Sequence, residues 1–134
     1  MAGTLYIDRP AAYAVITNAD GLLAVVQGPS GRLWLPGGGS LPEETAETTV
    51  VREVREELGY DMRLLYRIGE AVESFHAADE DRHYHMTAVF FRAELTNKLA
   101  STPEHELIWI LPNEAASRFF HGCHAWAVDR AVTC

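Results

Sequence analysis

Residues Gly38 to Tyr60 read GGSLPEETAETTVVREVREELGY, and this stretch says more about the fold than any other part of the chain. It fits the pattern G-x5-E-x7-R-E-U-x-E-E-x-G-U, in which U is a bulky apolar residue. Across 23 positions the pattern specifies seven identities at once: Gly38, Glu44, Arg52, Glu53, Glu56, Glu57 and Gly59. A solvated acidic helix explains neither this spacing nor the glycines, so it is the weaker interpretation.

Three glutamates share one side of the helix that this segment predicts. At about 3.6 residues per turn, Glu53, Glu56 and Glu57 fall within an arc of roughly 100°, close enough to share one metal centre. Without a counter-ion their like charges would destabilise the helix and raise one another's pKa values. Their ligand atoms are hard oxygens, which suit Mg²⁺ or Mn²⁺ and suit zinc poorly. The spacing therefore predicts a divalent-cation site.

The residues around these glutamates predict how the helix is held. An apolar stripe beside them is expected to pack on a sheet: Val50, Val51, Val54 and Leu58. Upstream, Trp34–Gly39 is a short apolar run that breaks into three glycines. Glycines allow a tight turn and a close approach of the backbone to a ligand, so the carbonyl of Gly37 is a candidate metal ligand. Gly59 is expected to end the helix in the left-handed conformation.

The segment is identified as a Nudix box, and the chain resembles the Nudix hydrolases, including MutT-like members. The resemblance implies an α/β fold, the Nudix-type α/β/α sandwich with a mixed β-sheet. It also implies that water cleaves a phosphoanhydride bond in a nucleoside diphosphate linked to another moiety, with Mg²⁺ or Mn²⁺. Near the fixed positions, Leu41 stands where an acidic residue is frequent and Glu43 where glycine is frequent. Tyr60 occupies a place that is usually aliphatic.

The resemblance carries metal-binding roles onto the matching positions. Glu56 and Glu57 would be the main metal ligands, together with the carbonyl of Gly37. Glu53 would either bind metal or act as the general base, and both roles stay open. Many family members add a carboxylate from a loop after the box. Here Glu104 is the first choice for that ligand, and Glu106 is the alternative.

Arg52 has a different implied role, which is to orient the glutamates through charge-assisted hydrogen bonds. Glu44 is its expected partner, and a simple surface pair with Glu56 is the alternative. The predicted catalytic residues are thus Arg52, Glu53 and Glu56. Gly38, Glu44 and Gly59 support the box.

Length and composition predict one Nudix hydrolase domain over residues 1–134. The chain is 48% hydrophobic, which is enough for one good core. Its net charge of −8 argues against non-specific binding of nucleic acid and fits a site that needs cations. Cys123 and Cys134 lack the spacing of a metal finger and are expected to be reduced thiols. Neither a leader nor a membrane span is indicated, so a cytoplasmic location is expected.

Hydrophobic periodicity and turn residues predict the elements. The strands are expected at Ala11–Thr17, Leu22–Val26, Leu33–Leu35, Arg63–Ile68, Ala71–Phe75, His85–Glu94 and Glu106–Leu111. The helices are expected at Thr45–Leu58, Pro112–Phe119 and Cys123–Val132. Asn18–Gly21 predicts a hairpin between the first two strands.

The sequence says less about the substrate. His76, His83, Tyr84 and His85 either line a substrate pocket or form an ordinary polar segment beside a strand. The stretch Phe75–Ala78 has neither the proline typical of ADP-ribose enzymes nor the tyrosine typical of dinucleoside polyphosphate enzymes. Small size favours a nucleoside triphosphate. Dinucleoside polyphosphates, nucleotide sugars and a non-catalytic nucleotide-binding module acting as a sensor or interaction domain are the alternatives, and a homodimer is compatible with the family.

Overall fold

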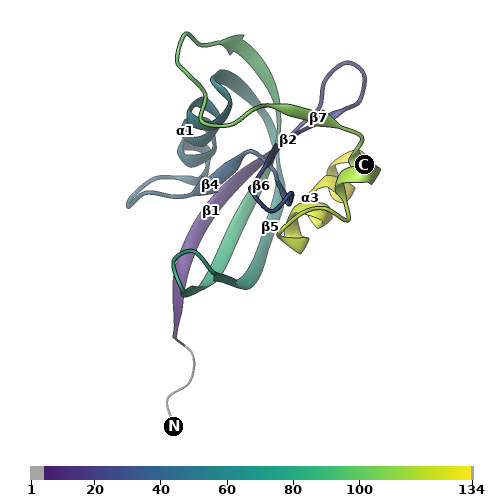
Figure 1. The fold of residues 1–134 in the computed structure, drawn as a ribbon. Helices are drawn as coiled ribbons and strands as arrows, with labels where there is room; N and C mark the ends of the chain where they lie inside the picture. The colour runs from purple at the N-terminus through teal and green to yellow at the C-terminus, as the bar shows by residue number, and fades with distance from the viewer. Residues whose placement is uncertain (1–4, 134) are drawn as a thin grey trace.

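A computed structural model describes residues 5–133, which form a larger sheet with helices on its two sides and a smaller sheet beside it (Figure 1). The strands are β1 (Tyr6–Ile16), β2 (Leu23–Gln27), β3 (Leu33–Trp34), β4 (Gly37–Gly39), β5 (Tyr60–Ala77), β6 (Arg82–Lys98) and β7 (Ile108–Ile110). The helices are α1 (Ala46–Leu58), α2 (Pro112–Ala115) and α3 (Gly122–Thr133).

The larger sheet is mixed, as predicted. Its strand order is β4-β1-β6-β5, with β1 parallel to β6 and the other two pairs antiparallel. The smaller sheet has the order β3-β2-β7 and is antiparallel. Helix α1 lies on one side of the larger sheet and α3 on the other (Figure 1). The predicted α/β sandwich is therefore confirmed, with a second sheet that the sequence analysis did not separate.

The hairpin predicted at Asn18–Gly21 is right in its turn and wrong in its strand pairing. The side chain of Asn18 accepts hydrogen bonds from the N–H groups of Asp20 and Leu22, which closes the turn. Beyond it, β1 and β2 are joined by a single bridge between Thr17 and Leu23. The two strands then separate, because β1 pairs with β4 and β6 while β2 pairs with β3 and β7.

Several predicted element boundaries are also corrected. The two strands predicted at Arg63–Ile68 and Ala71–Phe75 are one strand, β5, whose interruptions are absorbed as register shifts against β6. Strand β1 begins five residues earlier than predicted, at Tyr6. Helix α2 ends at Ala115 and does not reach Phe119, because residues 118–120 turn to pair with Leu33.

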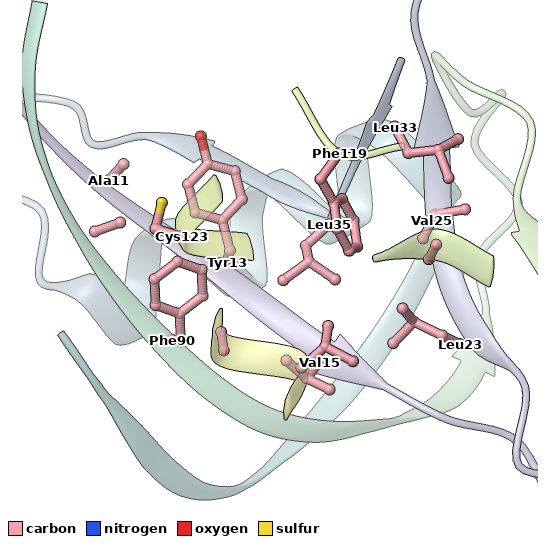
Figure 2. Packing of buried hydrophobic residues seen from close by; sticks show 14 of the residues in the cluster. Ala11, Tyr13, Val15, Leu23, Val25, Leu33, Leu35, Phe90, Phe119 and Cys123 are labelled. Carbon is pink, nitrogen blue, oxygen red and sulfur yellow. The ribbon is translucent and has the colours of Figure 1, made fainter. Parts of the chain in front are cut away.

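Two apolar clusters fill the two sides of the larger sheet. On the α1 side, alternate residues of β1 pack against Val50, Val54 and Leu58 of the helix. Val51 was predicted to join them but is only half-buried. On the α3 side, Figure 2 shows Tyr13, Phe90 and Cys123 packed together. Alternation along β1 therefore gives each helix its own face of the sheet.

Helix α3 covers its face of the sheet through buried residues near its start. Cys123 is free and buried, so this thiol is unpaired as predicted, whereas Cys134 lies outside the described residues. His124 is fully buried, and its Nδ1 accepts a 3.1 Å hydrogen bond from the N–H of Leu35.

Within residues 5–133, neither α1 nor any other helix has the length and apolar composition that crossing a membrane requires.

Candidate active site

Helix α1, which carries the predicted glutamates, is capped at both ends. Thr45 is the N-cap, and its Oγ1 accepts a 3.1 Å hydrogen bond from the N–H of Thr48. At the other end, Gly59 has φ 71° and donates its N–H to the carbonyl of Arg55. The predicted left-handed cap at Gly59 is confirmed. The caps fix where the helix begins and ends, and the packing of Val50, Val54 and Leu58 on the sheet sets which side faces β4.

Glu57 is the most enclosed of these carboxylates. Its Oε1 accepts a 2.7 Å hydrogen bond from the N–H of Gly37, and the residue is 8% exposed. Gly37 has φ 145°, and a β-carbon there would lie 2.2 Å from the carbonyl oxygen of Ala12, so this position requires glycine. Burial raises the pKa of Glu57 to about 8, with a smaller contribution from the negative charges of Glu53 and Glu104.

Glu53 lies directly against the next glycine. A β-carbon on Gly38 would come within 2.8 Å of the carboxyl carbon of Glu53, so the missing side chain makes room for this group. Burial raises the pKa of Glu53, while Arg52 opposes that rise. Gly37 and Gly38, the first two of the three glycines of β4, thus each lie against one carboxylate of α1.

Arg52 connects the remaining parts of the box. Its guanidinium binds Glu44 through two parallel hydrogen bonds, Nε to Oε2 at 2.7 Å and Nη2 to Oε1 at 2.9 Å. Nη1 lies 3.0 Å from Oε1 of Glu53 and 3.2 Å from Oε2 of Glu56. Nη2 also donates to the carbonyl of Gly39 at 3.1 Å. The predicted contact with Glu44 is therefore present, and the alternative contact with Glu56 is present beside it.

Glu44 is fixed from several directions besides Arg52. Its Oε1 accepts hydrogen bonds from the N–H of Leu41 at 2.8 Å and from the hydroxyl of Thr49 at 3.0 Å. The hydrogen bonds from Arg52, followed by that from Leu41, lower the pKa of Glu44 to about 2. This carboxylate is therefore an ionised anchor for Arg52. The backbone between these residues turns through Glu43, which has φ 67°.

The main chain brings Glu104 to the end of α1. The N–H of Glu104 donates to the carbonyl of Glu56 at 3.0 Å, and the N–H of His105 donates to the carbonyl of Glu57 at 2.9 Å. These bonds satisfy two carbonyls that the last turn of a helix leaves open. The charge of Glu104 contributes to the raised pKa values of Glu53 and Glu57. Glu104 and Glu106 are both exposed, and it is the charge of Glu104 that acts on the two buried glutamates.

The carboxylate oxygens gathered at the end of α1 are the kind of ligand that a hard divalent cation prefers. Glu53, Glu56, Glu57 and Glu104 act electrostatically on one another, and every donor is a carboxylate oxygen. Among residues 5–133, no three acidic, imidazole or thiol groups stand around one point at the distances that would hold a metal. Arg52 bridges Glu53 and Glu56 in this arrangement. A cation would therefore share these carboxylates with the guanidinium or displace its Nη1.

The histidines on the β5–β6 hairpin do not form one pocket with Tyr84. His76 and His83 have ring centroids 4.5 Å apart, whereas Tyr84 packs on Phe75 with centroids 5.4 Å apart on the α3 side of the sheet. Adjacent strand residues face opposite sides, which explains the split. Arg9, in the part of β1 that precedes the predicted strand, lies over the ring of Tyr84. No motif marks that arginine.

Comparison with known proteins agrees with the geometry. The family model described as NUDIX domain matches residues 8–127. The chain belongs to the Nudix family. The resemblance drawn from the box is therefore confirmed.

Curated relatives and solved structures extend this match. A Mycobacterium tuberculosis protein, in strains CDC 1551 / Oshkosh and H37Rv, is 33% identical over 105 residues and carries the name "Putative 8-oxo-dGTP diphosphatase 3". The match covers 77% of this chain and 48% of the relative, so the chain spans about half the length of the curated relatives it matches.

Two solved structures share the fold at lower identity. The MutT protein from Methanosarcina mazei Go1 has a TM-score of 0.72 at 21% identity, over 98% of this chain and 97% of that one. A NUDIX hydrolase from Nitrosomonas europaea has a TM-score of 0.72 at 17% identity, over 95% and 90% of the two chains. At these identities the likeness concerns the fold.

Proposed function

We propose that this chain is a metal-dependent pyrophosphohydrolase that cleaves a phosphoanhydride bond in a nucleoside diphosphate linked to another moiety. One observation carries the proposal. Glu53 and Glu57 are withdrawn from solvent beside Glu56 and Glu104, and burial, with smaller contributions from the neighbouring negative charges, raises their pKa values. A hard cation would offset the negative charge of these carboxylates, and Gly37 and Gly38 let the backbone of β4 lie close to them.

The residues divide the work as follows. Glu56, Glu57, Glu104 and the carbonyl of Gly37 would hold Mg²⁺ or Mn²⁺, with Glu53 as a further ligand or as the base that takes the proton of water. When bound, such a cation polarises phosphate oxygens and makes bound water more acidic. Arg52, anchored by Glu44, holds Glu53 and Glu56 in position.

A nucleoside triphosphate is the proposed substrate, as the small size of the chain suggests. The name of the mycobacterial relatives adds 8-oxo-dGTP to the compounds that should be tried. Dinucleoside polyphosphates and nucleotide sugars complete the panel. We propose further that residues 1–134 act as one catalytic domain in the cytoplasm; a homodimer remains compatible with this function.

The test measures phosphate and pyrophosphate release from this panel with Mg²⁺ or Mn²⁺, in the wild type and in Glu57→Gln. Glu47→Gln is the matched control, because Glu47 is exposed in the first turn of the same helix. We expect metal-dependent turnover that Glu57→Gln abolishes and Glu47→Gln preserves. If a nucleotide raises the melting temperature but none is hydrolysed, the binding-module alternative replaces the enzyme.

The loop carboxylate is tested in the same assay. Glu104→Gln should lower turnover substantially, and Glu106→Gln should not, because the main-chain bonds bring Glu104 to the end of α1. If Glu104→Gln keeps full turnover while Glu57→Gln loses it, Glu104 is not a ligand.

A further inference from the structure

Among the partly buried arginines of residues 5–133, Arg9 alone has a buried nitrogen without a hydrogen-bond partner. The side chain is half-buried, its Nε is fully enclosed, and no acceptor within residues 5–133 forms a hydrogen bond with that atom. Arg92, also partly buried, donates to the carbonyls of Val15 and Ala93 and to the hydroxyl of Thr17. A buried polar group without a partner is costly, so this arginine calls for an explanation.

The protein has many acidic residues that could have paired with Arg9. The chain carries 19 aspartates and glutamates and a net charge of −8, and Arg52, Arg55, Arg63 and Arg67 all form ion pairs. Within the described part of the chain, Arg9 forms no such pair. A cation left free in so acidic a molecule is available to an anion from outside.

Two neighbours fix the guanidinium of Arg9. Its central carbon lies 5.3 Å from the centroid of the Tyr84 ring, which is a cation–π contact with a buried residue. A β-carbon on Gly39 would lie 3.2 Å from Nε of Arg9, so the glycine leaves the space that the guanidinium uses. Strands β1 and β4 run side by side there (Figure 1), and their register pairs Ala11 with Gly39.

Gly39 also links Arg9 to the candidate active site. Its carbonyl accepts the 3.1 Å hydrogen bond from Nη2 of Arg52, and the guanidinium of Arg9 packs near its α-carbon. The backbone of one residue therefore separates Arg9 from the group that holds Glu53 and Glu56. Arg9 and the carboxylates of α1 thus lie on the two sides of the edge strand β4.

We propose that Arg9 is a substrate-binding residue that donates hydrogen bonds to anionic oxygens of the phosphate chain, from the side of β4 opposite α1. The proposal rests on the proposed function for the nature of the substrate. A guanidinium suits this role because its planar set of donors matches phosphate geometry and it remains charged at any physiological pH.

Calorimetric titration with inorganic tripolyphosphate in the presence of Mg²⁺ tests the proposal, because this probe has no base and binding needs no turnover. Arg9→Gln and Arg9→Met each remove the charge but keep a long side chain. Each should weaken the binding of tripolyphosphate about tenfold or more. Arg9→Lys should recover part of the loss. Arg67→Gln is the control, since Arg67 is exposed on β5 at the opposite edge of the sheet.

The proposal is overturned if either neutral variant folds and binds tripolyphosphate as tightly as the wild type, or if the wild type does not bind it. A loss confined to nucleotides, with tripolyphosphate unaffected, would also overturn it and make Arg9 a contact for the base. Failure of hydrolysis would leave this binding result intact, so the two proposals fail separately.

Discussion

The main-chain N–H of Gly37 donates a 2.7 Å hydrogen bond to Oε1 of Glu57. This hydrogen bond joins the edge strand β4 to the last turn of α1. This bond favours the ionised carboxylate, yet burial outweighs it and the pKa of Glu57 rises to about 8. The metal-free protein therefore contains a glutamate that is easier to bury when protonated.

The metal-free protein should lose stability as the pH rises from about 4.5 to about 8. Over this range Glu57 keeps its proton in the folded state, whereas the unfolded chain has released it. The protonated carboxyl therefore stabilises the folded state fully below pH 4.5, and this stabilisation is lost as the pH rises to about 8. The loss should be on the order of 3 to 5 kcal/mol. Urea denaturation with a chelator present measures it across the pH range.

Glu57→Gln should remove most of this pH dependence, because an amide does not titrate. Glu47→Gln should retain it, since that residue is exposed in the first turn of α1. An unchanged slope in Glu57→Gln would assign the effect to another group.

Gly38→Ala should impair turnover more than it impairs folding. The added β-carbon would lie 2.8 Å from the carboxyl carbon of Glu53, so the carboxylate must move from its place. We expect turnover to fall about 100-fold, since an error of an ångström at a reacting group has this effect. Gly122→Ala is the control, because its β-carbon meets nothing nearer than 3.8 Å. Equal activity in both variants would show that Glu53 is not held for catalysis.

Arg52→Lys should lower metal affinity or turnover about 10- to 100-fold, although the positive charge is kept. Lysine cannot reproduce the two parallel bonds to Glu44 while it also contacts Glu53. Arg55→Lys provides the comparison, because Arg55 is an exposed residue of the same helix and pairs with Asp61. Steady-state kinetics over a series of Mg²⁺ concentrations distinguishes the two effects. If Arg52→Lys kept the wild-type turnover and Mg²⁺ affinity, only the positive charge of Arg52 would matter, and its hydrogen-bond geometry would not.

Glu43→Gly should stabilise the protein. Glu43 has φ 67°, which costs a residue with a side chain about 1 to 2 kcal/mol and glycine much less. Glycine loses more conformational entropy on folding, so the net increase in the free energy of unfolding should be at most about 1 kcal/mol. The same substitution at Glu47, inside α1, should instead destabilise the protein by about 1 kcal/mol. Thermal unfolding of both variants decides this, and a lower melting temperature for Glu43→Gly would contradict the expectation.

The sequence predicted the box region well, because local rules determine it. Thr45 and Gly59 cap the helix through bonds to residues three or four positions away, and the apolar positions Val50, Val54 and Leu58 follow the helical period. The prediction that Arg52 contacts Glu44 also held, since both lie within the motif. The roles proposed for these residues in binding metal and in catalysis stay predictions.

What the sequence could not supply depends on contacts between distant segments. The separation of β1 from β2 follows from which strands pair with each of them, and the length of β5 follows from its pairing with β6. The position of Arg9 between Gly39 and Tyr84 likewise follows from the folded structure. Such partners lie tens of residues apart, where periodicity and propensity give no guide.

The main-chain bonds from Glu104 and His105 to the carbonyls of Glu56 and Glu57 also restrict how this chain can change in length during evolution. One residue inserted or deleted between Leu99 and Glu104 would shift these bonds by one position and move the loop carboxylate away from the helix. The turn at Asp79–Asp81 is exposed at the far end of the β5–β6 hairpin, where extra residues would disturb neither α1 nor β4. Length differences among relatives should therefore collect at that hairpin turn and be rare between residues 99 and 104.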